Sequence, residues 1–117
     1  MTSLDIVKIA VQAADSKKGH EIRVIKIRDI SVLADYFVFV SGDSNTQTRA
    51  IAEEVEFKLS GAGEEPHHIE GSQSGWICLD YGSVVVHVFH KEQRQYFQLE
   101  RLWEDGEEID PSTLLEN

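Results

Sequence analysis

The chain has 117 residues, the size of one compact domain, which excludes two independently folding units. It carries 21 acidic and 11 basic side chains, a formal charge of −10, which repels phosphate and argues against direct nucleic-acid binding. The charge favours a basic protein partner, although it also suits a protein that merely stays in solution. The one cysteine, Cys78, excludes an internal disulfide and a CxxC metal site.

Residues 1–11 lack the basic start and the long apolar run of a signal peptide. No segment contains the roughly 20 apolar residues that a membrane-spanning helix needs. We therefore expect a cytoplasmic protein without a membrane partner, although a chain trimmed of an organelle transit peptide would look the same.

The first predicted elements are a helix and a strand. Apolar residues recur at helical spacing between Leu4 and Ala14. The polar stretch 15–19 ends this helix, with Gly19 as its expected cap. The β-branched segment 22–27 then predicts a strand.

A second strand and a second helix follow. The unbroken apolar run 36–40 is typical of a strand that is covered on both faces. Ser44, with Gln47 three positions later, has the capping-box pattern that opens a helix, and Pro66 cannot continue it. Four apolar residues form the expected core side of this helix: Ala50, Ile51, Val55 and Leu59.

The rest of the chain predicts three strands, a helix and a tail. A short strand is expected at 67–71, and 76–81 with 84–89 predict a β-hairpin. Apolar positions within 96–103 predict a third helix, whereas the acidic stretch 104–117 is expected to be a flexible tail. The element order predicts the α/β class: one domain over residues 1–103, with a mixed sheet of about five strands and flanking helices.

The turn Ser41-Gly42-Asp43-Ser44 could hold an anion at the start of the second helix. It lacks the glycines and lysine of a phosphate loop, and it is similar to the Gly-Ser turn of nucleotidyltransferases. Those enzymes need a nearby acid pair for a metal ion, but Asp43 has only the distant Asp80 as a possible second acid. A metal-dependent nucleotidyltransferase remains the alternative function.

Four histidines, His67, His68, His87 and His90, could bind zinc or transfer protons. Their spacing does not make them converge, so we expect His87 to be a buried, hydrogen-bonded side chain. No metal and no cofactor is predicted.

The hairpin has a large aromatic residue on each face. Strand alternation places one set of three side chains on one face and a second set on the other. Either one face is an exposed protein interface or both faces are core. The two sets are Trp76, Cys78 and Asp80, and Ile77, Leu79 and Tyr81.

Three stretches have a specific order and spacing. They are Asp35-Tyr36-Phe37-Val38 leading into Ser41-Gly42-Asp43-Ser44 and Gln47; Gly75-Trp76 through Leu79-Asp80-Tyr81-Gly82 into Val86-His87-Val88-Phe89; and Tyr96 through Leu99-Glu100-Arg101-Leu102-Trp103. Together they resemble the Iojap or ribosomal silencing factor family, from about Leu4 to Trp103.

The resemblance implies a non-enzymatic factor that binds the large ribosomal subunit at its intersubunit face. Its target would be a basic protein, ribosomal protein fourteen (L-fourteen), and its effect would be to block subunit joining and repress translation. The implied fold is similar to that of nucleotidyltransferases without their catalytic acids. Bacterial members are cytoplasmic and form homodimers, and relatives act on organelle ribosomes.

The resemblance also implies where the partner binds. Residues 73–74 depart from the family pattern, so the edge of the contact is left open. Glu70 is added because of its charge beside Gly71. The expected partner-binding residues are Trp76, Ile77, Leu79, Asp80, Tyr81 and Glu70.

Overall fold

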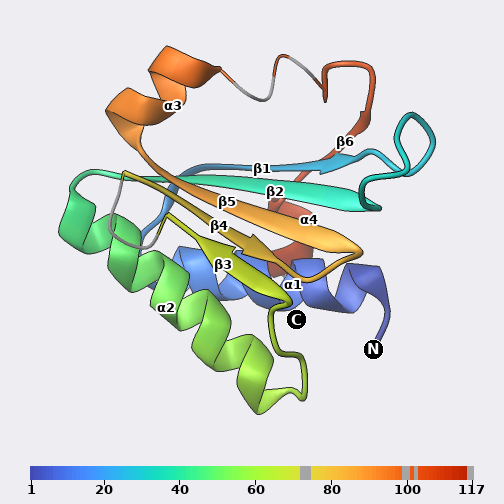
Figure 1. The fold of residues 1–117 in the computed structure, drawn as a ribbon, viewed down its shortest axis with the longest axis horizontal. Helices are drawn as coiled ribbons and strands as arrows, with labels where there is room; N and C mark the ends of the chain where they lie inside the picture. Colours follow the sequence, from blue (N-terminus) through green and yellow to red (C-terminus); the bar gives the residue numbers. More distant parts are fainter. Residues whose placement is uncertain (72–74, 99–100, 102, 116–117) are drawn as a thin grey trace.

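The computed structural model describes residues 1–71, 75–98, 101 and 103–115. A six-stranded sheet, in the order β3-β4-β5-β2-β1-β6, forms its centre (Figure 1). The strands are β1 (His20–Lys26), β2 (Tyr36–Gly42), β3 (His68–Glu70), β4 (Trp76–Asp80), β5 (Val84–His90) and β6 (Glu107–Ile109). The helices are α1 (Ser3–Ser16), α2 (Asn45–Gly61), α3 (Lys91–Phe97) and α4 (Ser112–Leu115).

The sheet is mixed. β2 and β5 are parallel, whereas β1 with β2, β1 with β6, β3 with β4 and β4 with β5 are antiparallel. Helices α1 and α2 cover one face, and α3 lies over the other (Figure 1). The predicted α/β class is confirmed, with one strand more than expected.

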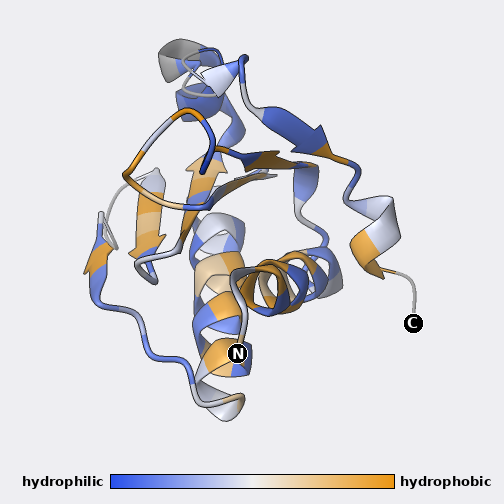
Figure 2. Cartoon of the chain, turned by 90° about the vertical axis from the view of Figure 1, so that its right-hand side faces the viewer, coloured by the Kyte–Doolittle hydropathy of each residue, from blue (hydrophilic) through white to orange (hydrophobic). Residues whose placement is uncertain are grey.

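The strand β2 is buried at every position, as its apolar run predicted. Side chains of alternate strand residues, such as Val38 and Val86, pack with α1 and α2 in the larger core. Phe37 and Phe39 point to the opposite face and form a smaller core with Phe89. Figure 2 shows apolar residues along the strands and along the helices packed on them.

Helix α1 begins with a full capping box: Thr2 Oγ1 accepts from the Asp5 amide at 3.1 Å, and Asp5 accepts from the Thr2 amide at 3.0 Å. The prediction of Gly19 as its cap is wrong, because Lys17 caps the helix and Lys18 has the positive φ of 61°. Gly19 is instead required by close packing, since a Cβ there would lie 2.5 Å from Val40 Cγ2.

Helix α2 begins as predicted at Ser44, whose Oγ accepts from the Gln47 amide at 3.0 Å. The Gln47 side chain does not complete the box, because its Oε1 accepts from the Asp43 amide instead. Ile51, Val55 and Leu59 are buried as expected, whereas Ala50 is only half-buried. The crossover through α2 carries β3 past β5 and β4 to the edge of the sheet.

The third helix is displaced from its predicted position. It follows β5 directly, begins at Lys91, and ends at Phe97 before Gln98, which is left-handed with a φ of 49°. His90 Nδ1 caps its start by accepting from the Glu92 amide at 3.1 Å. Two predicted helix residues, Leu99 and Leu102, lie outside the described residues. No glycine or proline separates strand from helix, so the sequence carried no boundary signal.

The acidic stretch 104–117, expected to be a flexible tail, contributes β6 and α4. Ile109 pairs with Val24 of β1, and Leu114 is buried in the core near α1. The Arg23 Nε atom donates to Glu108 across these strands at 2.7 Å. A strand of three residues and a helix of four leave almost no periodicity in a sequence, so neither was predicted. No helix of the described chain is long and apolar enough to span a membrane.

Candidate functional site: an aromatic sheet face

The face of the sheet that lies away from α1 and α2 is rich in aromatic side chains. As predicted, Trp76, Cys78 and Asp80 lie on this side of β4, whereas Ile77 and Leu79 point into the larger core. We call the following residues the aromatic face: Phe37, Phe39, Trp76, Cys78, Asp80, Val85, His87, Phe89 and Trp103.

The rings of the aromatic face hold one another in place. The Trp76 ring stacks on Phe89 with centroids 5.2 Å apart, and its Nε1 donates to His87 Nδ1 at 3.3 Å. His87 also stacks on Phe39 at 5.1 Å, while Phe37 meets the edge of Trp103 at 5.0 Å. Such stacked and edge-to-face pairs add to the gain from apolar burial, so the surface is preorganised.

Exposure separates the expected partner-binding residues into two groups. Trp76 and Asp80 are half-buried, and Glu70 is exposed. By contrast Ile77, Leu79 and Tyr81 are buried in the core, with 1–4% of their surface exposed. The structure therefore buries these three side chains and leaves Trp76, Asp80 and Glu70 within reach of a partner. Alternation explains the result, because a sheet with helices on one face buries every second residue there.

Carboxylates lie at the edge of the aromatic face. Glu70 of β3 stands opposite Cys78 in the register, and Asp80 lies on the same side of β4. Burial, together with the charges of Asp80 and Glu70, raises the pKa of the Cys78 thiol to about 11. The thiol is therefore protonated, and uncharged, at neutral pH. The negative charge of this part of the surface comes from the carboxylates of Glu70 and Asp80.

His87 lies at the centre of the aromatic face and is buried. Burial lowers its pKa to about 4, and the negative charge of Asp80 opposes this shift. The imidazole is consequently neutral at pH 7. Its Nδ1 accepts from Trp76, as a buried histidine requires, while its Nε2 has no hydrogen-bond partner within the part of the chain that the structure describes.

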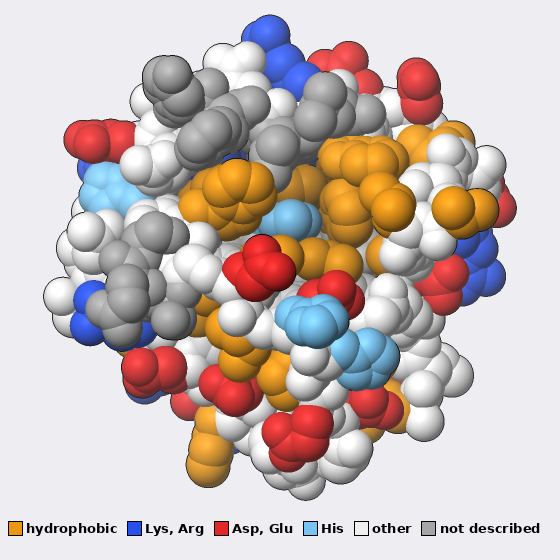
Figure 3. All heavy atoms as spheres, viewed as in Figure 1, with side chains coloured by type: hydrophobic (Ala, Val, Ile, Leu, Met, Phe, Trp, Pro, Cys, Tyr) orange, Lys and Arg blue, Asp and Glu red, His pale blue; other side chains and the backbone are white. Residues whose placement is uncertain are grey.

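A shallow groove of about 300 Å³ runs beside Trp76, lined also by Glu70, Gly71 and Cys78. Figure 3 views this side of the molecule and shows hydrophobic side chains gathered around a histidine, with acidic side chains next to them. An apolar, aromatic centre with charges at its rim is the composition of many protein–protein interfaces.

The predicted catalytic alternatives do not assemble. Asp43 follows the carboxyl end of β2, whereas Asp80 stands opposite Val85, near the start of β5. Since β2 and β5 run parallel, the two acids lie at opposite ends of the sheet. Asp43 Oδ2 lies 2.8 Å from His20 Nε2 instead. Among the described residues, no three His, Cys, Asp or Glu side chains gather as a metal ion would require.

Sequence reasoning on the hairpin missed part of the aromatic face. Phe37 lies on β2 and Trp103 follows α3, and neither was assigned to the site. Alternation along 36–40 could have shown that Phe37 and Phe39 share one face, but no local pattern reveals which neighbouring strands they meet.

The whole chain, residues 1–117, matches the family described as "Ribosomal silencing factor during starvation". It is 40% identical over 107 residues to the ribosomal silencing factor RsfS of Bacillus subtilis, covering 91% of each chain. It is 38% identical over 111 residues to the RsfS of Halalkalibacterium halodurans, covering 94% of this chain and 95% of that relative. A mouse relative, 30% identical, is named "Mitochondrial assembly of ribosomal large subunit protein 1".

Solved structures share the fold. A crystal structure of a protein from Chromobacterium violaceum superposes with a TM-score of 0.86 at 33% identity, covering 94% of this chain and 92% of that one. A protein from Bacillus halodurans gives a TM-score of 0.81 at 36% identity, covering 92% and 99%. Fold, length and sequence agree over almost the full chain. The chain therefore belongs to the family of ribosomal silencing factors.

Proposed function

We propose that the chain binds the large ribosomal subunit through the aromatic face and thereby prevents the small subunit from joining. The observation that carries this proposal is the half-buried Trp76, held by Phe89 and His87 on a preformed apolar surface. An aromatic ring that is fixed before binding loses little conformational entropy when a partner covers it. Membership of the ribosomal silencing factor family supplies the ribosome as the target.

The proposed contact on the ribosome is a basic protein, ribosomal protein fourteen (L-fourteen), at the intersubunit face. Glu70 and Asp80 lie beside the apolar centre and would face cationic side chains of that protein. The formal charge of −10 supports a protein target over ribosomal RNA, since an acidic chain is repelled by a phosphate backbone. Little direct contact with nucleic acid is part of the proposal.

The proposed mechanism is steric and involves no catalysis. A factor that covers part of the intersubunit face occupies the space that the small subunit needs, so translation falls without any covalent step. The alternative of a nucleotidyltransferase lacks support, because Asp43 faces His20 and lies at the opposite end of the sheet from Asp80. We also propose a cytoplasmic homodimer, on the family resemblance. Light scattering coupled to gel filtration measures the mass of the assembly.

Sedimentation with purified ribosomal subunits tests the main proposal. The protein should pellet with large subunits and remain in the supernatant with small ones. A subunit-joining assay should then show fewer complete ribosomes as the concentration of the factor rises. Equal recovery with both subunits, or recovery with neither, would overturn the proposal.

A further inference from the structure

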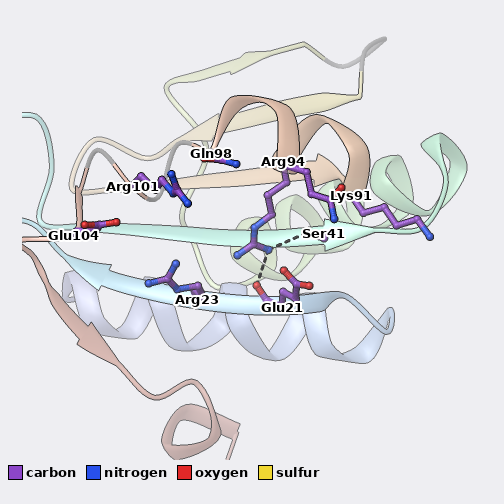
Figure 4. Close-up of a pocket in the computed structure, with 9 residues that line it drawn as sticks. Glu21, Arg23, Ser41, Lys91, Arg94, Gln98, Arg101 and Glu104 are labelled. Atoms are coloured by element: carbon purple, nitrogen blue, oxygen red, sulfur yellow. Dashed lines mark hydrogen bonds between the residues drawn. The ribbon is translucent and has the colours of Figure 1, made fainter.

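A second hollow lies on the face of the sheet that α3 covers. Its lining comes from Glu21 and Arg23 of β1, from Ser41 near the carboxyl end of β2, from α3 and from the residues after α3 (Figure 4). It shares no lining residue with the groove beside Trp76. Small ligands bind in concave sites where a few polar groups converge.

The hollow has a volume of about 330 Å³, and its lining is unusually basic for this chain. Among the described residues, four of the 11 cationic side chains line it together with two carboxylates, which gives these lining residues a formal charge of +2 in a molecule of −10. The cations come from β1, from α3 and from the segment after α3 (Figure 4). They are Arg23, Lys91, Arg94 and Arg101; the carboxylates are Glu21 and Glu104.

Arg94 is the fixed centre of this hollow. Its side chain is buried, with 4% of its surface exposed, and its Nη1 donates to Ser41 Oγ at 2.8 Å and to the Glu21 carbonyl at 2.6 Å (Figure 4). Glu21 has a positive φ of 48° and lies in a register shift of β1 between His20 and Arg23. Such shifts redirect backbone groups and are frequent next to binding sites. Here the carbonyl is turned toward the guanidinium.

Two other cations of the hollow form ion pairs at the surface. Arg23 Nε lies 2.7 Å from Glu108, and Lys91 Nζ lies 4.0 Å from Asp43, all with half-exposed or exposed side chains. Exposed pairs of this kind contribute little and exchange readily. Lys91 and Arg101 are both exposed, so their side chains can turn toward a ligand beside Arg94.

We propose that this hollow binds a small phosphate-bearing anion of the size of pyrophosphate. The exposed guanidinium of Arg101 offers paired donors that match two phosphate oxygens, and Lys91 adds a mobile point charge. The volume lies at the low end of the range of small-molecule sites, about 300–1,000 Å³, and so suits a compact anion. A nucleic-acid strand would be repelled by the rest of the acidic surface. The site lies apart from Trp76, so it does not depend on ribosome binding.

Isothermal titration of the full chain with sodium pyrophosphate tests this site, with ionic strength matched by sodium chloride. We expect saturable binding of one pyrophosphate per chain. The double variant Lys91→Gln/Arg101→Gln should raise the Kd by at least about tenfold, because each substitution removes a charge-assisted hydrogen bond. The control Lys8→Gln/Lys58→Gln removes the same charge from exposed positions on α1 and α2 and should leave the Kd within about twofold.

Thermal melting of both double variants verifies that they fold, since all four side chains are exposed. The proposal is overturned if wild type shows no saturable heat up to about 10 mM pyrophosphate, a concentration at which even a weak anion site is filled. It is also overturned if both double variants weaken binding equally, because pyrophosphate would then respond only to net charge.

Discussion

Trp76 is the residue on which the proposed interface depends most. We expect Trp76→Ala to weaken large-subunit binding by about 2 kcal/mol or more, roughly thirtyfold, because a central interface aromatic is lost. Phe57→Ala is the matched control, since it removes another aromatic ring that is 69% exposed on α2, over the opposite face of the sheet. Subunit pelleting and thermal melting of each variant are the measurements. A folded Trp76→Ala that binds like wild type, or one that unfolds, removes Trp76 from the site.

His87 makes the stability of the domain depend on pH. Burial lowers its pKa from 6.5 to about 4, so between these values the unfolded chain binds a proton that the folded chain does not. Stability is therefore complete above about pH 6.5 and falls, by up to about 3 kcal/mol, as the pH drops toward 4. Urea unfolding at several pH values measures this slope.

The variant His87→Phe should flatten the slope, because a phenyl ring keeps an aromatic group beside Phe37 and Phe39 and cannot be protonated. The control His68→Gln removes an imidazole from an exposed position and should keep the slope of the wild type. If His87→Phe and wild type lose stability in parallel between pH 6.5 and 4, the assignment to His87 is wrong.

At the scale of elements, the docking of α4 is open to direct test. Leu114 is 9% exposed and lies in the core near α1, so Leu114→Ala should lower the free energy of unfolding by about 2 kcal/mol. Ser112→Ala changes an exposed side chain of the same helix and should alter the free energy of unfolding by less than about 0.5 kcal/mol. Equal, small effects would mean that the end of the chain does not stabilise the fold.

The turn between β2 and α2 distinguishes a binding protein from an enzyme. Its acid, Asp43, lies 2.8 Å from His20, and no group of three His, Cys, Asp or Glu side chains that could hold a metal ion is found within the described chain. We expect no magnesium-dependent transfer from labelled nucleotides, and near-normal ribosome binding in Asp43→Ala. Saturable transfer that disappears in Asp43→Ala would establish the enzyme alternative.

At the scale of the whole molecule, the formal charge of −10 should govern how fast the partner is found. Long-range attraction to a basic protein raises the association rate, and salt screens it over about 10 Å at 0.1 M. Raising salt from about 50 to 300 mM should slow association roughly tenfold and change dissociation little. Biolayer interferometry separates the two rates. A faster dissociation at an unchanged association rate would contradict electrostatic steering.

Much of the fold was predictable because its signals are local. The run 36–40 predicted a strand buried on both faces, Ser44 predicted the start of α2, and the hairpin of β4 and β5 was confirmed. The errors lie where the local sequence carries no boundary signal or where an element depends on contacts with distant residues. Helix α3 follows β5 without a glycine or proline that would mark the boundary. Strand β6 is held by pairing with β1, some 80 residues away in the chain, and the periodicity of a short stretch of sequence cannot reveal such a pairing.

For the candidate site, the sequence by itself determined the charge, the family motifs and the division of β4 into two faces, since side chains alternate along any strand. Only the tertiary structure decided which face is open. Helices α1 and α2 both pack on the side of Ile77 and Leu79, which leaves Trp76 and Asp80 on the side where a partner can reach them. Tertiary structure likewise brought Arg94 to Ser41, 53 residues apart in the chain, because strand order and crossovers, unlike alternation, depend on contacts between distant segments.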